Sequence, residues 1–253
     1  MDAEGRRRGI LDTVRQTGYA DVAKLAADLG VSKETVRRDL SVLADHGLVR
    51  RRHGGAYPVE SGGFETTLDV RTTMQISEKS RIAAAAAELL GDASTVYIDE
   101  GYTPQLIAVA LPRDRPLTVV TSSLGTAGAL AAFDNMTVLL LGGRVRGGTM
   151  ATVDHWATRM LAGLIVDLAY IGANGISREY GLTTPDPAVS EVKAQVIRSS
   201  RRRVFSGVHK KFGAVSFCRF GDVTEVEAIV TDTGLSVSEA HRYSLLGPHV
   251  IRV

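Results

Sequence analysis

Residues 21–40, DVAKLAADLGVSKETVRRDL, decide how the first part of this 253-residue chain folds. Apolar side chains recur every three or four residues in two short runs, which is the spacing of a helix with one buried face. The runs are Val22, Leu25 and Leu29, then Val36, Leu40 and Leu43. Gly30 lies between them, where glycine favours a tight turn. The stretch therefore predicts a helix-turn-helix, the layout in which the second helix enters the major groove of DNA.

The second helix is expected to present a polar face. At about 100° per residue, Glu34, Arg38 and Ser41 point away from the apolar stripe, and Thr35 and Arg37 flank it. An arginine guanidinium is a planar set of donors that matches either a guanine edge or a phosphate. We therefore predict base or near-base contacts from Thr35, Arg37 and Arg38, with a merely solvated charged face as the alternative.

Two neighbouring features predict phosphate contacts. Ser32 is placed to cap the second helix, and the helix N-terminus that follows favours an anion beside Lys33. Downstream, residues 48–57, LVRRRHGGAY, combine a short apolar start with a basic run and a Gly-Gly turn. This pattern predicts a hairpin wing whose basic side chains lie along the sugar-phosphate backbone.

Together these motifs resemble those of the DeoR family of bacterial transcriptional regulators. That family's winged helix-turn-helix carries the pattern Val-Ser-x-x-Thr-Val-Arg-Arg-Asp-Leu, a further leucine, and a basic wing that ends in glycine. Residues 31–40, Leu43 and residues 51–56 match it position by position. The resemblance implies a sequence-specific DNA-binding regulator, most often a repressor, whose partner is a double-stranded operator. The predicted DNA-binding set is Ser32, Lys33, Glu34, Thr35, Arg37, Arg38, Arg50, Arg51, Arg52 and His53.

Length and composition fit a small domain followed by a larger one. Hydrophobic residues make up 44% of the chain, which is enough for a real core. The most apolar run, residues 82–90, is too short to span a bilayer, and the N-terminus lacks the apolar stretch of a secretory signal. Cys218 is the only cysteine, so an intrachain disulfide is impossible and a reducing cytoplasm is the expected location. We expect no membrane contact.

Positive charge is concentrated at the start of the chain. Up to Ala56 there are eleven lysines and arginines against eight acidic residues, a balance of +3, whereas the whole chain carries +2. Such a distribution is expected of a DNA-binding head on a neutral body. A head with so few excess charges would hold DNA weakly. We therefore expect a homo-oligomer, a dimer or a tetramer, that reads paired half-sites.

Three segments are expected along the chain. Residues 1–57 form the DNA-binding head, which begins with a helix over residues 5–17 whose Arg6-Arg7-Arg8 run either touches phosphate or is solvated. Residues 58–90 form a proline- and glycine-containing linker over 58–63 and a connecting helix over 64–90. In the DeoR family a similar Glu-Lys-x-x-Ile-Ala segment joins head and body, so this helix is a candidate to transmit a signal. Residues 91–253 form an effector-sensing and oligomerisation domain.

From Thr95 onward, short apolar runs alternate with segments of helix length. The expected strands are 96–99, 117–121, 137–141, 168–172, 203–206 and 228–231, and the expected helices are 104–111, 124–133, 155–164 and 187–200. A helix at 236–246 and an edge strand at 249–253 are expected to end the chain. Such alternation predicts an α/β domain with a mainly parallel sheet covered on both faces.

Ligands of open α/β sheets gather at the carboxyl ends of the strands. Small residues, hydroxyls and cations lie at those strand ends in this sequence, which favours a phosphorylated metabolite as the ligand. The resemblance implies a ligand of the same kind, because the DeoR sensor domain typically senses sugar phosphates. That domain is similar in fold to ribose-5-phosphate isomerase and the coenzyme A transferases. The predicted effector-binding residues are Asp99, Gly101, Tyr102, Thr103, Thr121, Ser122, Gly142, Gly143, Arg144, Gly181, Thr183 and Lys211.

Departures from the family pattern bear on the ligand. The family's Asp-Ser-Ser-Lys-Phe-Gly segment stands here as residues 208–213, VHKKFG. Glu100 and Tyr102 replace small hydroxyl residues, and a carboxylate at Glu100 would repel a phosphate. An unphosphorylated or larger sugar-like effector, or one held differently, therefore stays open. Structural roles also stay open: Asp99 as a helix cap, the glycines as turns, and Lys211 and Arg144 as solvated cations.

The alternative function is a sugar-phosphate isomerase-like enzyme fused to a DNA-binding head. Proton transfer would then fall to Asp99, Glu100, Glu191 or Lys211. Fold similarity alone does not carry activity, and no compact acid-base set stands out in the sequence. We therefore expect that the protein is not an enzyme and binds no cofactor.

Two further interpretations follow from side-chain spacing. The six histidines are scattered without paired ligand spacing, which predicts no metal site. Trp156 and Met160, at i and i+4, are expected on one face of a core helix. A pure protein-interaction module would need neither the basic wing nor the polar helix face, so charge reversal at Arg37 would separate it from a DNA-binding protein.

Overall fold

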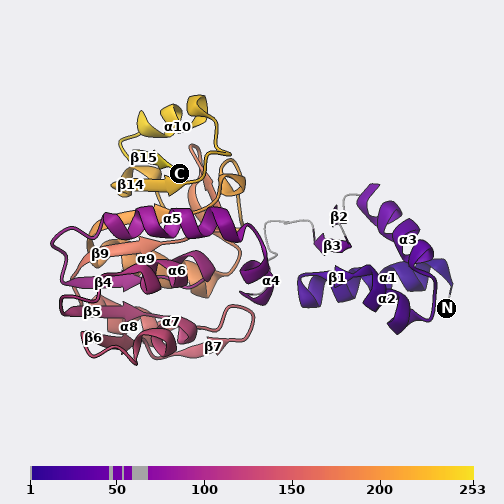
Figure 1. Cartoon of the computed structure of the whole chain (residues 1–253), viewed down its shortest axis with the longest axis horizontal. Helices are drawn as coiled ribbons and strands as arrows, with labels where there is room; N and C mark the ends of the chain where they lie inside the picture. The colour runs from indigo at the N-terminus through magenta and orange to yellow at the C-terminus, as the bar shows by residue number, and fades with distance from the viewer. Residues whose placement is uncertain (1, 46–47, 53, 59–67) are drawn as a thin grey trace. The chain divides into compact units, whose positions relative to one another are not determined.

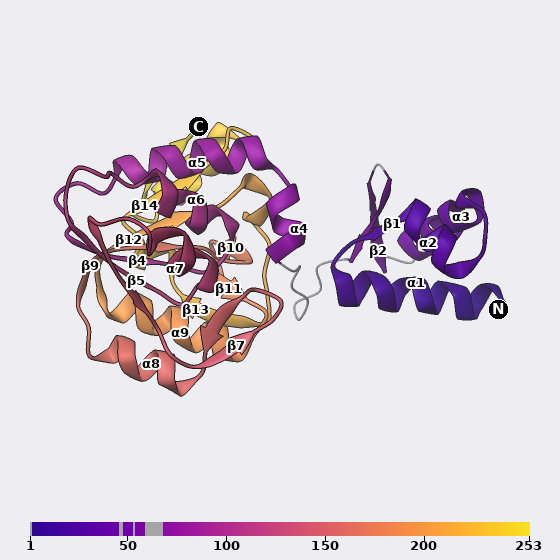
Figure 2. The ribbon, with the colours of Figure 1, turned by 60° about the horizontal axis from the view of Figure 1, so that its bottom comes forward.

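The structure is a computed structural model that describes residues 2–45, 48–52, 54–58 and 68–253 (Figures 1 and 2). The chain forms two compact units, Met1–Arg71 and Thr72–Val253. The division falls after the expected end of the head at residue 57 and before the expected start of the sensor domain at residue 91. Most of the expected connecting helix therefore belongs to the second unit.

The first unit is a winged helix-turn-helix, as the sequence predicts. Its elements are α1 (Ala3–Thr17), β1 (Ala20–Asp21), α2 (Val22–Leu29), α3 (Lys33–Asp45), β2 (Val49–Arg52) and β3 (Gly55–Pro58). The three strands form an antiparallel sheet in the order β1-β3-β2, so the wing hairpin is completed by a short strand before α2. The apolar faces of the three helices meet in one core that includes Ile10, Leu25, Val36 and Leu40.

Local caps set where these helices begin and end. Asp2 accepts a hydrogen bond from the Gly5 amide (2.8 Å), which starts α1 two residues before the expected position. Asp21 caps α2 by accepting from the amides of the next turn. Gly30 ends α2 with φ of 64°, a left-handed conformation that glycine adopts without strain. The tight turn between α2 and α3 therefore depends on this glycine.

An ion-pair cluster joins α1 to α3. Arg6 Nε lies 2.6 Å from one carboxylate oxygen of Asp39, and Arg7 Nε lies 3.0 Å from the other. Burial alone would raise the pKa of Asp39, but the hydrogen bonds from the two arginines outweigh burial and lower that pKa. Arg6 and Arg7 therefore bind a buried carboxylate of α3, a partner that the sequence did not predict, and phosphate contact by the Arg6-Arg7-Arg8 run stays a prediction.

The second unit is an α/β domain built on a seven-stranded parallel sheet, in the order β15-β14-β12-β9-β4-β5-β6. These strands are β4 (Thr95–Ile98), β5 (Leu117–Thr121), β6 (Met136–Leu140), β9 (Val166–Ile171), β12 (Ser200–Ser206), β14 (Ala228–Thr231) and β15 (His249–Arg252). The predicted mainly parallel sheet is confirmed. β12 begins three residues earlier than expected because α9 ends at Arg198.

Helices cover both faces of this sheet (Figure 2). One face packs against α5 (Ile76–Glu88), α6 (Tyr102–Ala110) and α7 (Leu124–Leu130), in a core centred on Ile82, Ile98 and Ile107. The other packs against α8 (His155–Ala162), α9 (Pro187–Arg198) and α10 (Val237–Ser244), in a core with Leu161, Ile171 and Phe205. The two cores fix the sheet between two helical layers.

Two small antiparallel sheets were not predicted. One contains β10 (Gly175–Ser177), β11 (Gly181–Thr184) and β13 (Cys218–Gly221), and the other is the hairpin of β7 (Arg144–Arg146) and β8 (Ala151–Val153). Two short 3-10 turns, η1 (His209–Lys211) and η2 (Val223–Glu225), complete the domain. Strands of three or four residues carry too few alternating side chains to reveal themselves by period.

The expected continuous helix over residues 64–90 is wrong. The described part of this segment forms α4 (Leu68–Thr73) and α5, separated by Met74 and Gln75. Gln75 has φ of 51°, a left-handed conformation that cannot continue a helix. No helix in the described ranges is long and apolar enough to cross a membrane.

Candidate nucleic-acid interface and effector site

The recognition helix α3 presents the polar face that its sequence predicts. Val36, Leu40 and Leu43 are buried, whereas Arg37 and Arg38 are exposed. Lys33 and Glu34 are also exposed in the first turn of the helix. Ser32 Oγ accepts a hydrogen bond from the Thr35 amide (3.1 Å) and lies 2.9 Å from the Thr35 hydroxyl. The serine therefore caps α3, and cationic side chains stand beside the capped end.

Several polar side chains on α3 already have partners. Arg37 Nη1 lies 3.4 Å from Glu34 Oε2, and both side chains are more than half exposed. An exposed pair of this kind contributes only about 0–1 kcal/mol, so a phosphate or a base can replace it at little cost. Ser41 Oγ donates to the Arg37 carbonyl (2.9 Å) and accepts from Arg51 Nη1 (2.6 Å). Arg51 thus ties the wing to the recognition helix.

The wing arginines do not share one face. Side chains alternate along a strand, so Arg51 lies on the same face of β2 as the buried Val49, and the exposed Arg50 lies on the opposite face. For Arg52 only the backbone in β2 is described, and His53 lies outside the described residues. The structure thus gathers Lys33, Arg37, Arg38 and Arg51 around α3 and places Arg50 apart from Arg51.

A buried charge cluster lies at the carboxyl end of β4 in the second unit. Asp99 Oδ2 accepts from the Gly172 amide (2.8 Å) and from Lys193 Nζ. Lys193 Nζ also donates to the Gly172 carbonyl (3.1 Å) and lies 3.7 Å from Glu100 Oε1. The three charged side chains are at most 5% exposed. The capping role left open for Asp99 is wrong, since the residue that caps α6 is Gly101.

Sequence reasoning missed Lys193. It lies on α9 among the buried residues Val189, Val192 and Val196, so a lone lysine on an apolar helix face was the available signal. A lysine in that position needs a buried counter-charge, and the nearest carboxylates come from a segment more than ninety residues away in sequence. Glu191, considered as a proton-transfer group, is exposed on the same helix.

Residues next to this cluster extend the site along the sheet edge. Thr103 is buried in the first turn of α6, and Lys79 of α5 holds its ammonium 5.5 Å from the centroid of the Tyr102 ring. On the other side, Lys211 Nζ donates to the carbonyl of Ala173. Lys193 and Lys211 thus bind successive carbonyls at the end of β9.

Several predicted effector residues have structural partners within the chain. Thr121 Oγ1 donates to the Ile98 carbonyl (2.7 Å) and accepts from the Ser123 amide (3.0 Å), and Ser122 Oγ lies 3.2 Å from the Tyr97 hydroxyl. Thr183 Oγ1 donates to the Gly175 carbonyl (3.3 Å). These hydroxyls therefore form hydrogen bonds within the chain, at or next to the ends of strands.

Gly181 has a backbone role. Its φ is 66°, and a Cβ at this position would lie 2.2 Å from the carbonyl oxygen of Gly221. Only glycine fits so close to a neighbouring backbone. Gly181 and Thr183 belong to the small β10-β11-β13 sheet, not to the buried charge cluster.

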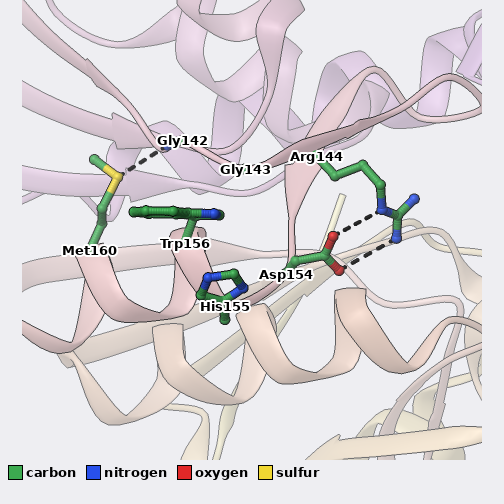
Figure 3. Close-up of a pocket in the computed structure, with 7 residues that line it drawn as sticks. All are labelled: Gly142, Gly143, Arg144, Asp154, His155, Trp156 and Met160. Atoms are coloured by element: carbon green, nitrogen blue, oxygen red, sulfur yellow. Dashed lines mark hydrogen bonds and ion pairs between the residues drawn. The ribbon is translucent and has the colours of Figure 1, made fainter.

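The glycine pair after β6 lines a separate pocket of about 500 Å³ (Figure 3). Its lining residues are Gly142, Gly143, Arg144, Asp154, His155, Trp156 and Met160. Arg144 Nε lies 2.9 Å from Asp154 Oδ2. This arginine, considered above as a solvated cation, therefore forms an exposed ion pair. None of the three buried charged residues at β4 is among the residues that line this pocket.

The expectation that Trp156 and Met160 face the core is wrong. Their side chains are 59% and 44% exposed, and α8 buries Ala157 and Leu161 instead. Positions 157 and 161 have the same i, i+4 spacing as 156 and 160, one step around the helix, so spacing alone could not tell which pair is buried. Met160 Sδ accepts from the Gly142 amide (3.1 Å), which ties α8 to the end of β6.

Charges around the buried cluster nearly balance. Asp99 and Glu100 bring two negative charges, and Lys193, Lys211 and Lys79 bring three positive ones. The repulsion expected between Glu100 and a phosphate is therefore offset by lysines that include one the sequence did not reveal. Among the described residues, no group of three or more metal-ligating side chains is placed to hold a metal ion.

Models of known protein families match both units. The DeoR-like helix-turn-helix domain matches residues 6–61, and the DeoR C-terminal sensor domain matches residues 74–233. The glycerol-3-phosphate regulon repressor of Escherichia coli K12 is 32% identical over 238 residues, which cover 94% of each chain. The HTH-type transcriptional regulator GlpR of Haloferax volcanii is 33% identical over 246 residues, which cover 97% of this chain and 96% of that one.

Solved structures with a similar course of the chain are more distant. The full-length sorbitol operon regulator of Klebsiella pneumoniae is 14% identical, with a TM-score of 0.41 over 97% of this chain and 99% of that one. Ribose 5-phosphate isomerase A of Methanocaldococcus jannaschii is 15% identical, with a TM-score of 0.38 over 53% of each chain. The assignment rests on the two family models and on the relatives that cover nearly the whole chain. The chain belongs to the DeoR family of transcriptional regulators, with a DNA-binding helix-turn-helix head and a DeoR sensor domain.

Proposed function

We propose that this regulator is a repressor that acts in the cytoplasm, binds operator DNA as a homo-oligomer and is controlled by a small phosphorylated metabolite. The observation that carries the DNA-binding part is the exposed face of α3, where Lys33, Arg37 and Arg38 surround a helix start capped by Ser32. A capped helix N-terminus and nearby cations are the features by which such helices hold phosphates and read bases. The repressor role is supported by the name of the Escherichia coli relative.

Within the head we assign two kinds of contact. Thr35, Arg37 and Arg38 contact bases, because the two arginines are exposed on α3 and Thr35 lies half-exposed beside its capped start. For Lys33, Arg50, Arg52 and His53 we propose phosphate contacts. Arg51 orients the wing through Ser41 as well as adding charge. Ser32 and Glu34 act by capping the helix and by holding Arg37 before DNA arrives.

We place the effector beside Asp99, Gly101, Tyr102 and Thr103, next to Lys211. Three lysines there, the buried Lys79 and Lys193 and the half-buried Lys211, outnumber the two buried carboxylates, and a positive balance favours a phosphate. Lys193 of α9 fixes the positions of Asp99 and Glu100 through its ion pairs with both carboxylates. The relative's name points to glycerol 3-phosphate as the first compound to test. Gly142, Gly143 and Arg144 line their own pocket and are left out of this assignment.

We propose that the second unit binds its effector and does not catalyse a reaction on it. Asp99 is occupied by Lys193 and the Gly172 amide, and Glu191 points to solvent from α9. An isomerase needs a carboxylate that can exchange protons with the substrate, and a carboxylate locked in an ion pair is poorly suited to that task. The relatives are named as transcriptional regulators.

Thermal unfolding of the full chain tests the effector assignment. A ligand that binds the folded state raises the melting temperature by an amount that grows with its concentration. We expect glycerol 3-phosphate or a related sugar phosphate to raise it, and glycerol and inorganic phosphate at equal concentrations to act as controls with smaller effects. If no phosphorylated compound in such a panel changes melting or operator binding, the effector assignment is wrong.

A further inference from the structure

Exposed apolar side chains are concentrated in the segment that runs from β6 to the start of β9. Seven of the sixteen large hydrophobic side chains that are exposed in the described part of the chain come from residues 139–165. They are Leu139, Leu140, Val145, Met150, Trp156, Met160 and Ile165. Leu139 and Leu140 lie on β6, and Trp156 and Met160 of α8 line the pocket beside Gly142, just after that strand. An exposed apolar patch is rare on a monomeric protein and marks an interaction surface. Tryptophan and methionine are also the side chains that interfaces favour.

The same region contains an open sheet edge. β6 is the last strand of the seven-stranded sheet, at its lower border in Figure 1. Its sequence, MTVLL, has no charged residue and no proline. Proteins usually protect an edge strand with such residues, because unpaired backbone groups there attract another strand. An uncharged edge strand is therefore suited to pair with a second strand.

Hydrogen bonds of the structure tell which backbone groups point outward from β6. The Leu117 amide donates to the Asn135 carbonyl (2.9 Å), and the Leu141 amide donates to the Thr121 carbonyl (2.9 Å). The backbone N–H and C=O groups of the odd-numbered residues of this strand thus point toward β5. Those of Met136, Val138 and Leu140 point away from the sheet. The Met136 amide already donates to the Phe133 carbonyl (2.9 Å).

We propose that β6 pairs antiparallel with β6 of a second copy of this chain, about a two-fold axis at Val138, and joins the two seven-stranded sheets into one. This deepens the proposed function, because it rests on the oligomer proposed there and names its surface. In this register Val138 exchanges two hydrogen bonds with Val138 of the other copy. Each Leu140 amide donates to the opposite Met136 carbonyl, which makes four bonds without disturbing the Met136 amide.

Side chains on both faces of the paired strands fit this occupant. Val138 packs against the core under α6 and α7, whereas Leu141 belongs to the core under α8. By alternation Leu140 lies on the α7 side, and Leu139 lies on the α8 side with Trp156 and Met160. A two-fold axis brings each of these sets against its own copy, as an isologous interface requires.

The ends of the strand are complementary in charge. Asp134 lies two residues before β6 and Arg144 lies four residues after it, and both are exposed. Antiparallel pairing brings the start of one strand to the end of the other, so each Asp134 comes near an Arg144 of the other copy. Arg144 already pairs with Asp154 through Nε and Nη2, and its Nη1 group can bind Asp134 in addition. Opposite charges at both ends favour this register over a parallel one.

A disulfide trap tests the register directly. In the full chain with Cys218→Ser, the Val138→Cys variant would place two thiols on opposite strands with Cα atoms about 5.5 Å apart, within the range of a disulfide. We expect mild oxidation to convert most of this variant into a covalent dimer on a non-reducing gel. The Leu139→Cys variant is the matched control, because its equivalent atoms lie about 7–8 Å apart and should stay unlinked.

Mass measurements of the full chain test the surface independently. We expect the unmodified protein to be a dimer or larger, and Leu140→Lys, at a position 42% exposed, to raise the dimer dissociation constant at least tenfold. Leu245→Lys, at an apolar position 73% exposed just after α10, is the control and should leave the dimer dissociation constant unchanged.

The outcomes separate this inference from the function it rests on. If the protein is oligomeric but Val138→Cys does not crosslink and Leu140→Lys leaves the mass unchanged, the β6 interface is wrong and the oligomer stands on another surface. If the unmodified protein is a monomer on and off DNA, the interface and the proposed oligomer both fail. DNA binding, measured on the same samples, reports separately on the head.

Discussion

Lys193 is the residue on which the buried charge cluster depends. Replacing it with methionine would leave Asp99 and Glu100 buried beside each other without their ammonium partner. Removing one partner of a buried ion pair typically costs about 3–5 kcal/mol. We expect Lys193→Met to lower the free energy of unfolding of the second unit by this amount in urea titrations. Arg201→Met, at an exposed position on β12, is the control and should change stability by less than about 0.5 kcal/mol.

Asp167 gives a pH dependence that can be checked at one residue. Hydrogen bonds from the Thr95 hydroxyl and amide lower its pKa to about 2 in the folded chain, against about 3.9 in an unfolded one. A carboxyl with a depressed folded pKa adds stability above the unfolded pKa, and that stability is lost as pH falls from about 4 to about 2. We expect Asp167→Asn to flatten this part of the curve of melting temperature against pH. An unchanged slope in the variant would contradict the assignment.

Single residues show where sequence reasoning stops. The cap at Ser32 and the exposed Arg37 and Arg38 could be predicted because each depends on its near neighbours in the chain. Lys193 and Asp39 could not, since their partners lie far away in sequence and only the folded backbone brings them together. Trp156 failed for another reason, because neighbouring helix positions had equal claims to the core.

The recognition helix and the wing make different contributions, which substitution can separate. Arg38→Ala removes a fork of donors from the middle of the exposed face of α3, so we expect weaker binding and relaxed operator choice, by about 1–3 kcal/mol. Arg51→Ala removes charge and the contact to Ser41, so binding should weaken evenly across sequences and depend less on salt. Anisotropy titrations on operator and scrambled duplexes at several salt concentrations measure both effects. Identical loss patterns for the two variants would contradict this division of roles.

Elements were predictable in proportion to their length and period. The helix-turn-helix, the wing and the seven parallel strands follow from clear apolar patterns, and six of those strands were placed from buried runs and the seventh as an edge strand. The break between α4 and α5 was not, because Gln75 carries no glycine or proline signal for its left-handed conformation. The β7-β8 hairpin and the small antiparallel sheet are too short to show a period.

At the scale of the whole chain, control requires that a ligand in the second unit change the behaviour of the head. Lys79 offers a route, because it lies on α5 and its ammonium lies 5.5 Å from the centroid of the Tyr102 ring at the start of α6. We expect Lys79→Met to leave operator affinity without ligand within about threefold of the unmodified protein, and to reduce the ligand-induced rise in melting temperature because one of the three positive charges at the site is lost. The ratio of operator affinities without and with ligand should fall, within the 5- to 150-fold range typical of such coupling. An unchanged ratio would place the coupling elsewhere.

Binding of the full chain to DNA tests the central claim most directly. Fragments of the source genome, mixed with the purified protein at low ionic strength, are recovered and sequenced with and without glycerol 3-phosphate and related sugar phosphates. The account predicts strong enrichment of a few duplexes with paired half-sites, loss of that enrichment with Arg38→Ala, and release by a phosphorylated compound. Recovery of all fragments in proportion to their length, with every compound and with none, would contradict it.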